Sequence, residues 1–201
     1  MSAAEKQALR TQMKTLREEV SARDPDAGET LATKFPIKLL ERYGPVVAAY
    51  LPIGSEIDPR PLMQRLTQAG AQLALPCVEA DGTMVYRAYT SGDMLEQRAF
   101  GLLEPLAGVP IVEPTLILTP LLAFDALGTR LGYGQGHYDR AIHRLRQRGR
   151  AFICGVAFQA QQLEAVPSEA HDIPLDWAVT ERGSIPIFMM RTFQAGANAK
   201  S

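Results

Sequence analysis

The stretch best suited to chemistry runs from Phe124 to Arg140 and reads FDALGTRLGYGQGHYDR. Its glycines at 132, 134 and 136 alternate with other residues and stand directly before a segment that we predict to be helical. Glycine lets backbone N–H groups converge on an anion, because it has no Cβ and adopts positive φ at little cost. A helix beginning there adds unpaired N–H groups and the positive end of its dipole. The pattern predicts a phosphate cradle, and the alternative is a tight turn without a ligand.

Charged residues beside these glycines refine the prediction. Arg130 and Arg140 flank the loop and favour an anion site over a bare turn. Asp139 is an acid in basic surroundings, and its carboxylate would repel phosphate unless a cation bridged the two. Mg²⁺ is held in this way, by one or two carboxylates together with phosphate oxygens. The loop matches neither G-x-x-x-x-G-K-[ST] nor G-x-G-x-x-G, so neither of these two nucleotide-binding motifs is present.

Two segments far from the loop carry further candidates. Lys6 and Arg10 lie four residues apart, on one face of a predicted helix. They could reach phosphates, or form part of a solvated basic stripe. Glu56 follows a predicted buried strand, at the sheet edge where ligands bind in α/β proteins. A surface acid in a loop is the other interpretation of Glu56.

Candidates also lie within and after the predicted helix. His137 could act as a general acid or base, or simply begin the helix. Tyr138 could stack on a ligand ring, or pack in the core. The segment from Pro167 to Glu181 offers Asp172 and Asp176 just before and at the start of a short strand, where they could equally serve as capping and turn residues. No Ser-His-Asp order and no H-E-x-x-H motif is present.

The composition excludes several classes of protein. Lys and Arg total 21 against 22 for Asp and Glu, and the net charge of −1 argues against a protein that coats nucleic acid or an anionic membrane. The two cysteines, Cys77 and Cys154, exclude a zinc module or disulfide scaffold and suit a reducing compartment. No apolar run approaches the roughly 18 residues of a membrane span. The charged start also argues against a signal peptide. We predict a cytoplasmic protein with no nucleic-acid or membrane partner.

Short apolar runs alternate with helical patterns along the chain. Helices are expected over the first 20 residues or so and over residues 27–42, 58–69 and 137–148. Strands are expected over residues 46–51, 72–75, 84–89, 115–118, 151–158 and 177–180. This alternation predicts an α/β fold with a largely parallel sheet. We predict a single domain over residues 1–193 and a disordered tail over 194–201.

Taken together, these segments resemble the 5-formyltetrahydrofolate cyclo-ligase (5,10-methenyltetrahydrofolate synthetase) family. The similarity runs from about Lys6 to Glu181 and covers nearly the whole chain. It begins with K-x-x-x-R at Lys6 and Arg10. It continues, in the family's order, with YLPIGSEID, FGLLEP, LTPLLAFDALGTRLGYGQGHYDR, HDIPLD and TE. The central motif is specific, and the terminal motifs support it.

The resemblance implies a three-layer α/β/α fold and an enzyme. Its reaction would convert ATP and 5-formyltetrahydrofolate to 5,10-methenyltetrahydrofolate, ADP and phosphate, with Mg²⁺. The formyl oxygen would be phosphorylated, and N10 of the folate would then attack as phosphate departs. Phosphoryl transfer chiefly requires positioning and charge neutralisation, so no nucleophilic side chain is required, and none is found.

The resemblance also implies roles for particular residues. ATP is expected to contact the helix at the start of the chain and the glycine loop, through Lys6, Arg10, Arg130, Gly132, Tyr133, Gly134, Gln135, Gly136, His137, Tyr138, Asp139 and Arg140. The folate is expected to contact Leu51, Glu56, Phe100 and Tyr138. Within this set, Glu56 and Tyr138 would orient the substrate. The expected ligands of Mg²⁺ are Asp139 and Asp176.

The loop departs from the family pattern. Many members have Arg at the place of Tyr133, Gly or Lys at Gln135, and an aromatic residue at His137. The loss of a loop cation bears on the strength of phosphate binding rather than on its location. Arg130 and Arg140 offer compensating charge.

Two other functions remain open at this point. One is a noncatalytic folate-binding or nucleotide-binding protein on the same fold. Retention of Asp139 and Asp176 favours the enzyme, because a pure binder has less need of Mg²⁺. The other is a different phosphate-handling enzyme, such as a sugar-phosphate isomerase on a related sheet, against which Glu56 argues weakly.

Overall fold

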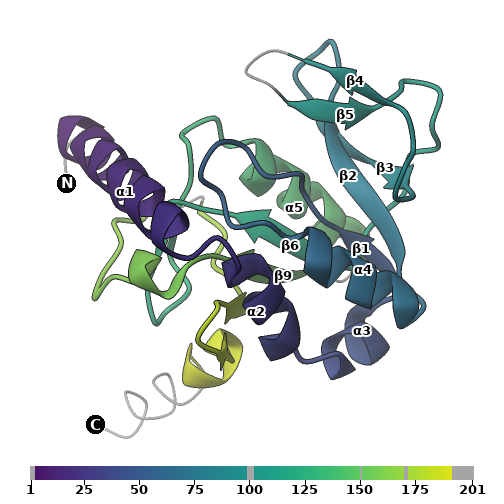
Figure 1. Ribbon diagram of the computed structural model, residues 1–201. Helices are drawn as coiled ribbons and strands as arrows, with labels where there is room; N and C mark the ends of the chain where they lie inside the picture. The colour runs from purple at the N-terminus through teal and green to yellow at the C-terminus, as the bar shows by residue number, and fades with distance from the viewer. Residues whose placement is uncertain (1–2, 99–101, 150, 170–171, 192–201) are drawn as a thin grey trace, which may run out of the picture.

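The central sheet organises the chain. A computed structural model describes residues 3–98, 102–149, 151–169 and 172–191. Within these ranges a seven-stranded sheet is covered by helices on both faces (Figure 1). The predicted three-layer α/β class with a largely parallel sheet is confirmed. The tail predicted over residues 194–201 lies outside the described residues.

Strands from distant parts of the chain alternate in the sheet, in the order β11-β10-β9-β6-β1-β2-β3. Their bounds are β1 (Val46–Ala48), β2 (Gln72–Val78), β3 (Met84–Tyr89), β6 (Leu116–Pro120), β9 (Phe152–Val156), β10 (Trp177–Val179) and β11 (Ser184–Ile185). Neighbours from β10 to β2 pair in parallel, and β3 and β11 add antiparallel edges. The carboxyl ends of β1, β2 and β6 therefore meet at one edge of the sheet.

Alternating side chains of the inner strands pack against the helix layers on the two faces of the sheet. One face is covered by α2 (Ala27–Lys34), α3 (Lys38–Tyr43) and α4 (Arg60–Gln68), and the other by α5 (His137–Arg148) (Figure 1). On β6, Leu116 and Leu118 belong to the first core, which includes Leu31 of α2, whereas Ile117 belongs to the second core with Ile142 of α5. This period of two is that of a strand buried on both faces.

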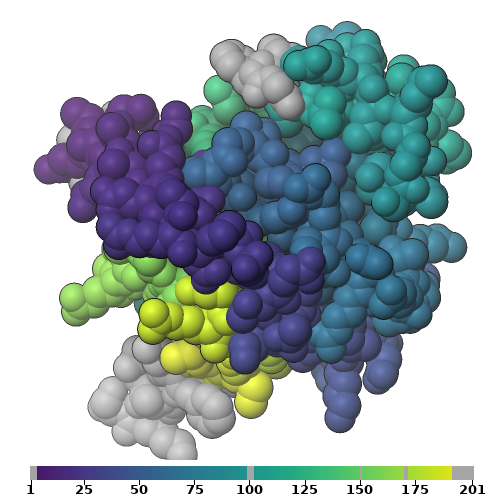
Figure 2. Space-filling view, viewed as in Figure 1, coloured from purple at the N-terminus to yellow at the C-terminus, as the bar shows by residue number. Residues whose placement is uncertain are grey.

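The first helix, α1 (Ala3–Arg23), lies at one end of the molecule rather than in either layer (Figure 1). Its Met13 is buried in a third small core with Leu131 of the hairpin β7 (Ala123–Phe124) and β8 (Arg130–Leu131). Figure 2 shows α1 seated beside the segment that contains the short helix η2 (Gln159–Gln161). A second hairpin, β4 (Leu95–Gln97) with β5 (Leu103–Pro105), contacts β2 through β5.

Several element boundaries differ from the sequence prediction. The helix expected over residues 27–42 is two helices, α2 and α3. Pro36 lacks an N–H and keeps Phe35 extended, at φ −67° and ψ 125°, so the first helix ends there. Strand β2 continues through Pro76, because β1 pairs with it only as far as Ala74. The two hairpins were not predicted.

The described helices include none with the length and apolar character needed to cross a bilayer.

Candidate active site

A cavity of about 760 Å³ opens at the carboxyl edge of the sheet. Its floor is formed by residues at the ends of β1, β2 and β6, among them Tyr50, Pro76 and Thr119. The walls come from the glycine loop, the start of α5, the first half of α1 and the β4–β5 hairpin. Ligands of open α/β sheets bind at this edge, beyond the carboxyl ends of the strands.

A second cavity, of about 870 Å³, lies between α4 and the outer strands β2 and β3. Three charged residues line it, Glu29, Asp58 and Arg60, and the last two pair with each other at 2.6 Å. This cavity lacks the converging charges of the first one. The chemistry therefore belongs to the cavity at the carboxyl edge.

The glycine loop forms one wall of that cavity, and α1 supports it. Gly134 has φ +92° and Gly136 has φ +65°, values that favour glycine. The Arg10 side chain packs so closely on Gly134 that an added Cβ would lie 3.3 Å from its guanidinium carbon. Arg10 also donates from Nε to the carbonyl oxygen of Gly132 at 3.1 Å. The loop therefore leads into the N-terminus of α5 with a cation beside it, as an anion site requires.

Two acids and two cations meet beside the loop. Arg130 pairs with Asp139 at 2.6 Å, and the backbone N–H of Ile173 donates to the same carboxylate at 3.2 Å. Lys6 lies 3.7 Å from the carboxylate of Asp172. Because Ile173 directly follows Asp172, the carboxylates of Asp139 and Asp172 stand at the same corner of the cavity.

Lys6 also holds a second acid at this corner. Its Nζ donates to Glu169 at 2.9 Å, and the backbone N–H of Glu169 donates to Asp172 at 2.8 Å. Lys6 thereby joins the first turns of α1 to the segment that precedes β10.

The opposite side of the cavity contains a buried acid, Glu56. Its side chain lies 3.6 Å from the guanidinium of Arg17, and both residues are under 10% exposed. The hydroxyl of Tyr133 donates to Glu56 and accepts a hydrogen bond from Arg17. The backbone N–H of Ile53 donates to the second carboxylate oxygen at 3.0 Å. Both carboxylate oxygens of Glu56 and the hydroxyl of Tyr133 thus have hydrogen-bond partners.

The electrostatics of Glu56 are governed by burial. Removal from water raises the pKa of its carboxyl above the ordinary 4.5, against the opposing influence of Tyr133, the Ile53 N–H and Arg17. Burial likewise raises the pKa of Tyr50 and Tyr138, so both phenols stay neutral. Burial therefore favours the protonated form of the Glu56 carboxyl, whereas Tyr133, the Ile53 N–H and Arg17 favour the carboxylate.

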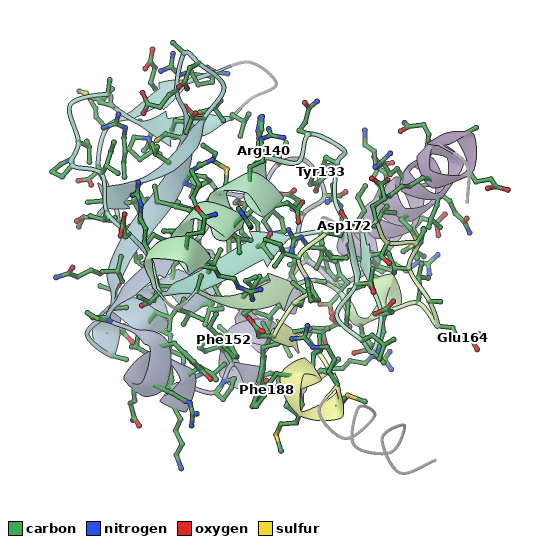
Figure 3. All side chains as sticks on the ribbon, turned by 180° about the vertical axis from the view of Figure 1, so that it is seen from behind. Tyr133, Arg140, Phe152, Glu164, Asp172 and Phe188 are labelled. Carbon is green, nitrogen blue, oxygen red and sulfur yellow. The ribbon has the colours of Figure 1, made fainter. Side chains whose placement is uncertain are left out.

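The structure brings most of the predicted site residues together. Those that line the cavity are Lys6, Arg10, Leu51, Glu56, Arg130, Gly132, Tyr133, Gly134, Gln135, Gly136, His137, Tyr138 and Asp139. Arg140 does not line it; its side chain is exposed on α5 beside Gly136. Figure 3 shows Tyr133 and Asp172 on the α1 side of the molecule and Arg140 near the start of α5. Phe100 lies outside the described residues.

Asp176 is not brought to the site. Its carboxylate accepts the backbone N–H of Ile153 at 3.0 Å, near the start of β9, and pairs with Arg146 at 3.0 Å and Arg191 at 3.1 Å. Those contacts place it at the amino ends of the strands, opposite the cavity. The expectation that Asp176 joins Asp139 around a metal ion is therefore corrected, and Asp172 is the acid that the fold places there.

Sequence reasoning missed two residues of the cavity or its support, Arg17 and Glu104. Arg17 stands eleven residues after Lys6, about three helical turns, so it shares the face of Lys6 and Arg10. That spacing was visible, yet nothing in the sequence linked it to Glu56. Glu104, buried at 4% exposure on β5, lines the cavity and accepts the backbone N–H of Val78 at 3.2 Å.

Comparison with known proteins agrees with this geometry. Residues 2–181 match the model of the 5-formyltetrahydrofolate cyclo-ligase family. The chain belongs to this family. The predicted membership and the predicted class of enzyme, a carbon-nitrogen cyclo-ligase, are thereby confirmed.

Two relatives within the family match along nearly their whole length. The 5-formyltetrahydrofolate cyclo-ligase of Haemophilus influenzae is 31% identical over 183 residues, which cover 87% of this chain and 97% of the relative. The enzyme of that name from Mycolicibacterium smegmatis is 32% identical over 197 residues, covering 92% and 98%. A solved structure, the 5,10-methenyltetrahydrofolate synthetase of Aquifex aeolicus, superposes with a TM-score of 0.72 at 30% identity, covering 90% of this chain and 92% of that one.

The burial of Glu56 predicts a specific dependence of stability on pH. A folded pKa above the ordinary 4.5 means that the folded state binds more protons than the unfolded state between those two values. Glu56 therefore reduces stability progressively as pH rises through that window. Over this window we expect the free energy of unfolding to fall less in the Glu56→Gln variant than in the wild-type protein. Urea unfolding from pH 4 to pH 8 measures the difference, and two parallel curves would contradict the raised pKa.

Proposed function

We propose that the protein converts 5-formyltetrahydrofolate to 5,10-methenyltetrahydrofolate, with ATP as co-substrate and Mg²⁺ as the metal. The observation that carries the proposal is a single cavity with an anion cradle on one side and a buried acid on the other. A reaction that joins a triphosphate to a heterocyclic substrate needs both features at once. Family membership supports the same reaction.

The cradle side suits the phosphates of ATP. The first residues of α5, whose backbone N–H groups lack partners within the helix, line the cavity, and Lys6, Arg10 and Arg130 supply positive charge around it. Arg130 and Lys6 are engaged with acids of the protein. An entering triphosphate therefore competes with carboxylates for these cations, and a divalent ion that takes over the carboxylates relieves the competition.

The acids at this corner fit Mg²⁺. Asp139 and Asp172 supply carboxylate oxygens, the ligands that this ion prefers, and one or two carboxylates suffice when phosphate oxygens complete the shell. Among the described residues no group of three or more His, Cys, Asp or Glu side chains is placed to hold a metal ion by itself. Bound there, Mg²⁺ would neutralise charge on the transferring phosphoryl group.

The opposite side suits a folate. Leu51, Leu75 and Met84 give the cavity an apolar lining, and Glu56 provides an acceptor for N–H groups of a pterin ring. Tyr138, at the start of α5, also lines the cavity and can contact a ligand there. A folate held beside Glu56 would present its formyl group toward the glycine loop.

The chain's contribution to the chemistry is positional. The γ-phosphoryl group passes to the formyl oxygen as its bond to the β-phosphate oxygen breaks, releasing ADP. N10 then bonds to the formyl carbon and loses its proton, and the carbon–oxygen bond breaks as phosphate leaves. Orientation by Glu56 and Tyr138 and charge neutralisation by Lys6 and Arg10 promote these steps. No side chain forms a covalent bond to the substrate.

The two cysteines support a cytoplasmic location, which we also propose. Cys77 and Cys154 are both buried and free. Unpaired thiols of this kind suit a reducing compartment.

The proposed reaction is tested directly with purified protein. We expect MgATP and 5-formyltetrahydrofolate to yield the near-ultraviolet absorbance of the methenyl product, together with equimolar ADP and phosphate. Omission of ATP or of Mg²⁺ should abolish the signal. Folate binding without any turnover would instead support the noncatalytic alternative.

The role of α1 in phosphate binding is tested at Arg10. We expect Arg10→Ala to raise the apparent KM for ATP about tenfold, because removal of one charge-assisted contact costs roughly 1.5 kcal/mol. Lys14→Ala, an exposed cation on the same helix, is the matched control and should leave the KM unchanged. An unchanged KM in Arg10→Ala would remove this residue from the ATP site.

The two acids of the segment before β10 make a matched pair for the metal. Asp172→Asn should raise the Mg²⁺ concentration needed for half-maximal activity severalfold, because a charged oxygen ligand is lost. Asp176→Asn should leave that concentration unchanged and lower only the free energy of unfolding, since its partners are Arg146, Arg191 and the Ile153 N–H. The reverse result would restore Asp176 as the ligand.

A further inference from the structure

Tyr133 connects the two sides of the cavity. Its backbone belongs to the glycine loop, between Gly132 and Gly134, whereas its hydroxyl is bonded to Glu56 and Arg17. The guanidinium carbon of Arg17 also lies 5.6 Å from the centre of the tyrosine ring. One side chain therefore spans from the proposed phosphate cradle to the proposed folate contact.

The far end of this connection is firmly held. Glu56 and Arg17 are buried and pair at 3.6 Å. Arg17 donates further to the hydroxyl of Ser55 at 3.1 Å, next in the chain to Glu56. A buried charge pair with its hydrogen bonds satisfied has little freedom to rearrange.

The near end is held through Arg10, which donates to the Gly132 carbonyl and packs on Gly134. Both chain neighbours of Tyr133 are glycines, whose backbone is less restricted than that of other residues. The tyrosine itself is 47% exposed, although its hydroxyl is bonded within the network. Phosphates bound by the loop would restrict this freedom and keep the hydroxyl on Glu56.

We propose that Tyr133 couples the two ligands: the Tyr133–Glu56–Arg17 network makes a bound nucleoside triphosphate increase the affinity of the protein for the folate. The inference rests on the proposed function and goes beyond it, because that function requires both ligands but no coupling between them. Tyr133 and Arg17 act here as positioning residues, through Glu56. The coupling is reciprocal, so the folate must strengthen nucleotide binding by the same factor.

The test is calorimetric titration of the full-length protein. 5-Formyltetrahydrofolate is titrated in the presence of Mg²⁺, with and without a non-hydrolysable ATP analogue, and the analogue is titrated with and without the folate. In the wild type we expect each ligand to tighten the other about tenfold, within the usual range of such coupling.

The Tyr133→Phe variant removes only the hydroxyl. We expect its coupling factor to fall below about twofold, whatever change the variant makes in the affinity for each ligand alone. Tyr43→Phe makes the same chemical change in a ring stacked on Phe152, remote from the cavity, and should keep the wild-type factor. A merely structural role for Tyr133 would weaken both ligands alone and leave the factor unchanged.

Arg17→Lys gives an independent measurement, because lysine keeps the charge but loses the planar fork that reaches Tyr133 and Ser55 together. Its coupling factor should also fall below that of wild type. If circular dichroism shows that Tyr133→Phe does not fold, the coupling factor of Arg17→Lys tests the proposal in its place, and a wild-type factor would overturn it.

The outcomes separate this inference from the proposed function. Wild-type protein that binds both ligands without coupling, or a Tyr133→Phe variant with the wild-type factor, overturns the coupling and leaves the reaction intact. Wild-type protein that binds the analogue but not the folate overturns the proposed function, and the inference with it.

Discussion

The burial of one carboxylate, that of Glu56, determines where much of the site lies. Removing a charge from water costs several kcal/mol unless an opposite charge and hydrogen bonds replace the solvent. Arg17 supplies that charge, and Arg17 belongs to α1. The helix must therefore lie across the end of the sheet, although it belongs to neither helix layer. Because a helix is stiff, Lys6 and Arg10 on the same face are carried to the glycine loop and to the acids beside it.

The features that the sequence predicted well depend on local pattern. The helix expected over residues 137–148 is α5 with the same bounds, because glycines precede it and its period is regular. The parallel sheet followed from apolar runs separated by helical ones, and the parallel order then placed the residues after β1 and β6 at one edge. Lys6, Arg10, Glu56 and the loop lie around one cavity for this reason.

The features that the sequence did not predict depend on contacts between distant segments. Asp172 and Asp176 are four residues apart in a segment without regular structure before β10, so no periodicity distinguishes the acid that faces the cavity from the one that ties β10 to β9. The choice is made by partners far away in the chain, Lys6 for the first and Ile153 for the second. Arg17 was visible on the basic stripe of α1, but its partner Glu56 is 39 residues later.

The same contacts involve Tyr133, which occupies a position where many family members have arginine. A cation does stand beside Tyr133, on α1 instead of the loop, but this cation, Arg17, is buried against Glu56. Arg17 does not line the cavity, whereas Lys6, Arg10 and Arg130 do. In place of the charge that an arginine would bring to the loop, Tyr133 forms a hydrogen-bonded connection from the loop to Glu56.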